Sequence, residues 1–192
     1  VFEADVFHAG MDEVFYLADD KCPRCSGRDE AELFAGEVTQ LYYHLKQQGK
    51  DLWIWGDRLI DGKTTGLGMW QASMNNTDRA IDLIPRDVVI CDWHYRIAVP
   101  SSVLFAMKGF DVITCPYQTP EVGQTQLEHL LTFRENSPEP MKERFLGMMQ
   151  TIWGGADEFL NVYYHGAEEA ERRKGSLDCF LQLYESINLL DE

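Results

Sequence analysis

The sequence is poor in positive charge and has no long hydrophobic run. Lysine and arginine number 17 against 32 aspartates and glutamates in 192 residues, a formal net charge of −15. Phosphate binding needs clustered cations, so a nucleic-acid partner is not expected, and a neutral or cationic ligand fits better. No apolar stretch reaches the roughly 18 residues of a membrane-spanning helix. Residues 1–6 lack the basic start and apolar core of a signal peptide, so any export signal is expected upstream and the compartment stays open.

Cysteine is scarce as well. The five cysteines are an odd number spread along the chain, which does not indicate the disulfide framework of a small secreted domain. Only Cys22 and Cys25 are close in sequence, as a C-x-x-C in a loop that contains proline and glycine. One such pair supplies half of a tetrahedral zinc site, so both residues are weak metal candidates. A disulfide that staples the loop is favoured, with zinc and free thiols as alternatives, and no cofactor is expected.

Short β-rich runs alternate with helical patterns along the chain. The runs cover residues 5–9, 52–55, 88–93, 111–115 and 149–153. This alternation is typical of parallel strands joined by crossover helices, and hence of an α/β fold. Helices are expected to begin at Asp29 and at Ser101 or Ser102, and to cover residues 125–134, 141–148 and 176–190. The Gly- and Asn-containing segment 61–85 is expected to be a long loop of the kind that carries function.

Polar and aromatic residues stand at the end of every run, where a parallel barrel places its active site. Carboxylates and tryptophans that converge on one rim are typical of a sugar site, because aromatic faces stack on a pyranose while acids act on the glycosidic oxygen. Each of these residues alone has a plainer interpretation as a helix cap, a packed core residue or a structural histidine. The coincidence at five successive strand ends favours the sugar site.

The segment from His8 to Glu13, with the sequence HAGMDE, resembles the H-x-G-G-D-E signature of glycoside hydrolase family 20. In this β-N-acetylhexosaminidase family the signature ends the fourth strand of a (β/α)8 TIM barrel. The five runs then resemble strands four to eight, so residues 1–192 would form the C-terminal portion of the barrel, with three strands missing. The stretches 22–25, 55–58 and 91–95 are also similar to a divergent branch of the family from gut-type bacteria.

The resemblance implies a retaining, substrate-assisted glycoside hydrolase with a carbohydrate as its partner. Asp12 would orient the 2-acetamido group of the substrate, and Glu13 would be the general acid/base. The other implied substrate-binding residues come from all five strand ends: His8, Trp55, Asp57, Trp93, Tyr117 and Trp153. The tryptophans would wall the acetamido group, Tyr117 would donate to its oxygen, and His8 would lie behind the site.

Three positions depart from the family pattern. Met11 stands where the signature has its second glycine, which restricts the turn. Gly154 and Gly155 follow Trp153, where the family has W-x-E, and Gln118 follows Tyr117 in place of a second acid. These changes affect contacts with sugar hydroxyls more than the catalytic pair, so the reaction class is better indicated than the sugar.

Two other classes of function remain compatible with the sequence. A metal-dependent hydrolase would use oxygen and imidazole ligands on the same rim: His8, Asp12, Asp57, Asp92 and His94. A non-catalytic carbohydrate-binding or structural barrel fragment is the other alternative. Because five strand–helix units leave sheet edges open, self-association or pairing with a missing N-terminal half is expected.

Overall fold

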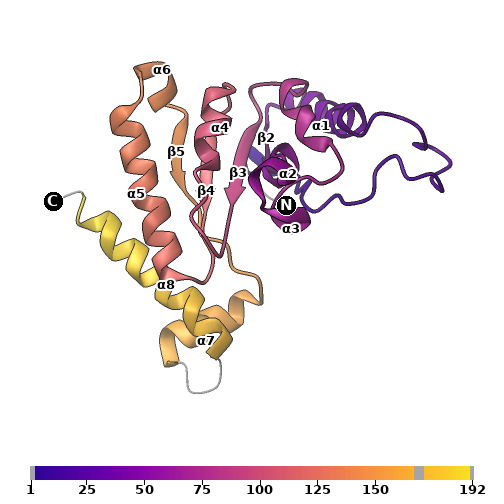
Figure 1. Ribbon diagram of the computed structural model, residues 1–192. Coiled ribbons are helices and arrows are strands. Elements are labelled where there is room, and N and C mark those ends of the chain that lie inside the picture. Colours follow the sequence, from indigo (N-terminus) through magenta and orange to yellow (C-terminus); the bar gives the residue numbers. More distant parts are fainter. Residues whose placement is uncertain (1–2, 167–170, 191–192) are drawn as a thin grey trace.

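A computed structural model describes residues 3–166 and 171–190, so the first two residues of the N-terminal segment 1–6 lie outside it (Figure 1). The centre of the molecule is one parallel sheet of five strands in chain order. The strands are β1 (Val6–His8), β2 (Asp51–Trp55), β3 (Val89–Trp93), β4 (Val112–Cys115) and β5 (Phe145–Met148). Because each strand neighbours the next one in sequence, every crossover runs in the same direction, as in a singly wound barrel.

Helices fill the connections. The longer ones are α1 (Glu30–Lys46), α4 (Ser101–Met107), α5 (Pro120–Asn136), α7 (Ala156–His165) and α8 (Glu171–Asn188), with the short α6 (Glu139–Lys142) before β5. The loop after β2 contains four short helical turns: η1 (Asp57–Leu59), α2 (Gly62–Thr65), α3 (Gly68–Gln71) and η2 (Thr77–Asp82). In the described part of the chain, none of the helices has the length and apolar character needed to cross a membrane.

The two faces of the sheet have different surroundings. On one face Leu52, Ile54 and Ile90 are fully buried against Phe34 of α1 and Phe105 of α4. The opposite face carries a separate cluster that no helix residue joins within the described chain, and that contains Trp53, Trp55, Val89, Cys91, Trp93, Ile113, Cys115 and Met149. Helices on one face only, with alternate side chains on the other, are the arrangement of a barrel wall. The α/β barrel-type fold predicted from the sequence is confirmed.

Local signals explain where the first long helices begin and end. The side chain of Asp29 accepts a hydrogen bond of 3.0 Å from the backbone N–H of Glu32, so α1 begins where the sequence predicted. Helix α4 begins at Ser101, also as predicted, and Gly109 follows it with φ of 91°, a left-handed conformation that lets the chain turn into β4. At the C-terminal end, α8 packs on α5 through Leu127, Cys179 and Leu183.

The fifth strand was predicted at the wrong place. Residues 149–153 are not a strand, and the helix expected over residues 141–148 ends at Lys142, after which Phe145–Met148 form β5. Phe145 is completely buried opposite Val112, and its carbonyl oxygen accepts from Nε of Arg134 in α5 at 2.7 Å. The pattern of this short apolar run fits a helix or a strand, and burial and strand pairing determine that it forms a strand. As a consequence, Trp153 lies in the loop after β5 and not on the strand.

Replacing Gly56, at the end of β2, with alanine is expected to lower the free energy of unfolding by about 1–3 kcal/mol. An added methyl group there would meet Ile90 at 2.8 Å and Phe105 at 2.9 Å. The matched control is Gly36→Ala within α1, where no atom lies within 4 Å of the new methyl group. This control is expected to gain up to about 1 kcal/mol from helix propensity. Urea denaturation measures both variants, and equal effects would contradict the close packing of α4 on β2.

Candidate active site

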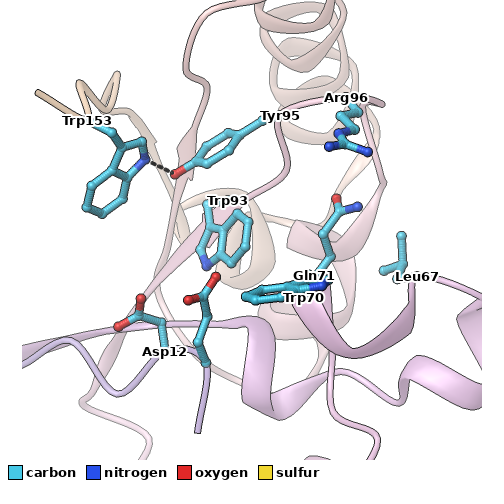
Figure 2. Close-up of a pocket in the computed structure, with 9 residues that line it drawn as sticks. Asp12, Leu67, Trp70, Gln71, Trp93, Tyr95, Arg96 and Trp153 are labelled. Atoms are coloured by element: carbon cyan, nitrogen blue, oxygen red, sulfur yellow. Dashed lines mark hydrogen bonds between the residues drawn. The ribbon is translucent and has the colours of Figure 1, made fainter. Parts of the chain in front are cut away.

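A cavity of about 560 Å³ opens at the C-terminal ends of the strands, where barrel proteins have their active sites (Figure 2). Four segments of the chain line it: the tip after β1, the loop after β2, the end of β3 with its loop, and the loop after β5. The lining residues are Asp12, Glu13, Leu67, Trp70, Gln71, Trp93, Tyr95, Arg96 and Trp153. Two adjacent carboxyl groups and four large aromatic rings therefore line the same cavity.

The tip after β1 is a turn in which several residues adopt left-handed backbone. Gly10 has φ of 75°, Met11 of 71° and Glu13 of 52°. The carbonyl of Gly10 accepts from the Trp55 N–H at 2.9 Å, and its own N–H donates to Nδ1 of His8 at 3.1 Å. Left-handed backbone costs a non-glycine residue on the order of 1–2 kcal/mol, so the contacts around the turn must maintain it. The turn places the neighbours Asp12 and Glu13 at the same cavity.

Asp57 anchors this turn from below. Its carboxylate accepts from the backbone N–H of Glu13 at 3.0 Å and from the indole Nε1 of Trp93 at 3.4 Å. The same carboxylate pairs with Nε of Arg58 at 2.7 Å. Asp57 is only 2% exposed and does not line the cavity. Through these hydrogen bonds it holds Glu13 and Trp93, which do line it. The sequence placed Asp57 among the substrate-binding residues, whereas its position fits a supporting role.

Arg58 extends the anchor to the loop after β2. The guanidinium is 1% exposed and donates through one terminal nitrogen to the carbonyl oxygens of Met69 and Ala72, each at 2.7 Å. It also stacks over the ring of Phe15 at 5.2 Å. These contacts fix the short helix α3, which brings Trp70 and Gln71 to the cavity. The buried Asp57–Arg58 pair therefore positions both the turn after β1 and the loop after β2 at the cavity.

The electrostatic surroundings of Glu13 suit an acid that keeps its proton. Partial burial raises the pKa of Glu13, and the nearby charges of Asp12 and then Asp57 raise it further, while Arg58 acts in the opposite direction. Burial also raises the pKa of Asp57, and the guanidinium of Arg58 opposes that shift. Two neighbouring carboxyl groups with different surroundings are the usual arrangement for separate acid and stabilising roles.

The aromatic walls come from three separate loops. Trp70 is 60% exposed and contacts Phe15 edge-on at 5.0 Å between ring centroids. On the other side, the hydroxyl of Tyr95 accepts from Nε1 of Trp153 at 3.0 Å, the bond drawn in Figure 2. Burial raises the pKa of Tyr95 to about 12, so its hydroxyl stays protonated at neutral pH. The indole of Trp93 lies between these two sides.

Three predicted substrate-binding residues lie behind the lining. Trp55 packs between His8 and Trp153, with ring centroids 4.4 Å and 6.1 Å apart. Tyr117 contacts Tyr95 edge-on at 5.2 Å. His8 has a buried Nε2 atom without a hydrogen-bond partner in the described structure. The cavity therefore brings together Asp12, Glu13, Trp93 and Trp153 of the predicted set, and the roles of all these residues stay predictions.

Five lining residues were not among those predicted: Leu67, Trp70, Gln71, Tyr95 and Arg96. Tyr95 stands directly after the third strand end, where its position could have marked it. Leu67, Trp70 and Gln71 belong to segment 61–85, which the sequence indicates as a functional loop without showing which residues face the site. For Arg96 we find no sequence signal.

The residues of the metal alternative do not converge. Within residues 3–166 and 171–190, no three His, Cys, Asp or Glu side chains form a group that could hold a metal ion. Asp57 is paired with Arg58, while Asp92 and His94 are buried against each other.

Cys22 and Cys25 are free thiols in this structure and do not form the favoured disulfide. A hydrogen bond from Cys25 lowers the pKa of Cys22, and the same bond raises the pKa of Cys25. Neither thiol lines the cavity.

The sheet order and the position of the cavity define a barrel-type α/β protein. Over 98% of its length the chain is similar to the crystal structure of the β-N-acetylhexosaminidase from Bacteroides fragilis NCTC 9343, with 20% identity and a TM-score of 0.51. It is also similar over 95% of its length to Dispersin B, with 16% identity and a TM-score of 0.46. The chain spans 40% and 53% of these two chains, respectively. The similarity to the Bacteroides structure confirms, at the level of the fold, the resemblance seen in the sequence. No family model and no curated protein matches the chain.

Replacing Asp57 with alanine is expected to lower the free energy of unfolding by about 3–5 kcal/mol, because the buried guanidinium of Arg58 loses its counter-ion. Asp82→Ala is the matched control, since Asp82 is 56% exposed and pairs with Lys108 at the surface. Loss of this surface ion pair is expected to lower the free energy of unfolding by less than about 1 kcal/mol. Chemical denaturation compares the two, and similar costs would show that the Asp57–Arg58 pair is not a structural anchor.

Proposed function

We propose that the protein is a glycoside hydrolase that releases β-linked N-acetylhexosamine with retention, through a substrate-assisted mechanism. The observation that carries the proposal is the position of Asp12 and Glu13 side by side in an aromatic-walled cavity at the C-terminal ends of a parallel sheet. The barrel-type fold, similar to that of a β-N-acetylhexosaminidase, supports the same class. Tryptophan faces offer stacking surfaces to sugar rings, and the paired acids supply the chemistry.

In the first step, the acetamido oxygen of the substrate attacks its own anomeric carbon while Glu13 gives its proton to the leaving glycosidic oxygen. Asp12 orients the acetamido group and stabilises the positive charge that develops on it. In the second step, water attacks the anomeric carbon and gives a proton to the carboxylate of Glu13, while the bond from that carbon to the acetamido oxygen breaks and the acetamido group is restored. Two inversions give net retention, and no enzyme nucleophile is needed. Burial and the charges of Asp12 and Asp57 raise the pKa of Glu13, which favours the protonated form that the first step uses.

The aromatic groups would hold the sugar in place. We assign stacking to Trp93 and Trp153, with Trp55 packed behind Trp153. Tyr95 offers a protonated hydroxyl at the cavity, and Tyr117 supports its ring from behind. Asp57 acts through Glu13, whose backbone N–H it accepts.

We also propose that β1–β5 take the places of strands four to eight of an eight-stranded barrel, and that residues 1–192 form its C-terminal portion. The sequential strand order and the helix-free inner face support this assignment. Phe7 on β1 is 52% exposed although its strand neighbour Leu52 is fully buried, so an uncovered edge exists there. Further strands, or a second copy of the chain, would cover such an edge. Three more strand–helix units upstream of residue 1 would agree with the assignment, and their absence would contradict it.

Glu13→Gln is expected to lower kcat/KM for a β-N-acetylhexosaminide with a poor leaving group by about two to four orders of magnitude. The loss is expected to be smaller with a nitrophenyl leaving group, which needs less protonation. Glu37→Gln, a similar change on the exposed side of α1, is the control and is expected to leave the rate unchanged. Steady-state kinetics of the complete protein measure this. Near-normal turnover of the poor substrate by Glu13→Gln would rule out Glu13 as the acid.

Asp12→Asn is expected to lower the pKa of Glu13, because the charge of Asp12 is one of the causes that raise it. The alkaline limb of the kcat profile, where Glu13 loses its proton, should then move to lower pH. An NMR titration of the labelled Glu13 carboxyl carbon measures the pKa directly, even in a variant of low activity. Asp78→Asn, outside the cavity lining, is the control. An unchanged Glu13 titration in Asp12→Asn would contradict the coupling of the two carboxyl groups.

A further inference from the structure

The two ends of the cavity differ in charge. Asp12 lies at one end in Figure 2, and Arg96 lies at the other, with Trp93 and Trp70 between them. Arg96 is exposed at the start of the loop after β3, and among the described residues no ion pair or hydrogen bond involves its side chain. The chain carries 32 acidic residues against 17 basic ones, and a guanidinium without an acidic partner leaves its positive charge available at the cavity wall.

Gln71 lines the cavity together with Arg96, and in Figure 2 its amide is drawn toward this end. Its amide oxygen Oε1 lies 3.2 Å from Nδ1 of His94. A carbonyl oxygen only accepts, so Nδ1 of His94 donates this bond. The amide nitrogen of Gln71 has no hydrogen-bond partner within the described chain and offers two N–H groups beside the guanidinium. This end of the cavity is therefore rich in donors.

A buried set of polar groups fixes the orientation of Gln71. His94 is 1% exposed, and its Nε2 lies 3.4 Å from Oδ1 of Asp92, which is 2% exposed. The hydroxyl of Ser101 lies within 2.9 Å of both oxygens of Asp92, to which it donates. Gln126 donates to the backbone carbonyl of His94 at 2.9 Å. Burying polar groups is costly unless they are paired, and this set is only partly paired: Nε2 of His94 and Oε1 of Gln126 are buried without a hydrogen-bond partner in the described structure. The amide of Gln71, which His94 holds through Nδ1, is the part of the set that lines the cavity.

We infer that Arg96 and Gln71 form a subsite for an anionic substituent, a carboxylate or a sulfate, on the carbohydrate that the cavity binds. The inference rests on the proposed function and names its substrate class. A planar guanidinium next to an amide matches the paired oxygens of either anion. The charge of Asp12 repels the same anion from the opposite end, so the charge separation also sets the direction in which the ligand enters. The net charge of −15 disfavours a long polyanion, so the ligand is a short acidic glycan or a chain end.

Binding of three probes tests the subsite: N-acetylglucosamine, its 6-O-sulfate, and a disaccharide of glucuronate and N-acetylhexosamine. Calorimetry or NMR titration is expected to give at least about tenfold tighter binding for one charged probe than for the neutral sugar. Whichever charged probe gains affinity identifies the anion as sulfate or carboxylate. The advantage is expected to decrease with salt, because an exposed guanidinium is screened.

Arg96→Ala is expected to remove this advantage, so that the charged probe loses more affinity than the neutral sugar. Arg24→Ala, which removes the same charge from the exposed loop before α1, is the control and is expected to keep it. Gln71→Glu, which places a carboxylate beside Arg96, is expected to weaken the charged probe more than the neutral one.

Equal affinity for neutral and charged probes would overturn the subsite, as would no measurable binding of the charged probes or an advantage that survives Arg96→Ala. These outcomes are separate from the catalytic test, because binding does not require turnover. If Glu13→Gln keeps its activity while the charged advantage still depends on Arg96, the hydrolytic mechanism fails and the subsite stands.

Discussion

The arrangement of the cavity depends on one buried ion pair, Asp57 with Arg58. It joins the end of β2 to the turn after β1 through the N–H of Glu13, and to the following loop through the carbonyls of Met69 and Ala72. In a low-dielectric interior such a pair is strong when its other donors and acceptors also find partners. Here these partners include the backbone N–H of Glu13, the indole of Trp93 and the carbonyls of Met69 and Ala72. The acidic wall and the aromatic wall therefore have a fixed relative position, which the proposed binding of a rigid sugar ring would require.

The two faces of the sheet differ: one packs into the main core, and the other leads to the cavity. The face under the helices carries branched side chains of the main core, such as Ile54 and Ile90, which pack against Phe105 of α4. The other face carries tryptophans and cysteines, and the cavity lies where its strands end. Because alternate residues of a strand point to opposite faces, the same short strand serves both purposes. Trp93, the last residue of β3, belongs to the inner cluster and lines the cavity as well.

Much of this architecture could be predicted from the sequence, because the first four strands are bounded by clear helix and turn signals. The pair Asp12 and Glu13 could be predicted because residues at strand ends share one rim in a parallel sheet. The fifth strand could not, since a short apolar run has no period of its own and is decided by the burial of Phe145. Gln71 was missed for another reason: its position depends on contacts that Arg58 makes with the loop around it and on His94, which is distant in sequence. Arg96 carries no sequence signal that marks it as part of the site.

The left-handed backbone of Met11 determines which substitutions this position accepts. The positive φ of position 11 limits which residue types fit there, independently of side-chain packing. Residues branched at Cβ, such as valine, isoleucine and threonine, clash with their own backbone there, whereas glycine and asparagine adopt this conformation readily. The backbone of this turn therefore accommodates glycine in place of Met11, whereas valine or isoleucine there would strain the turn that positions both acids.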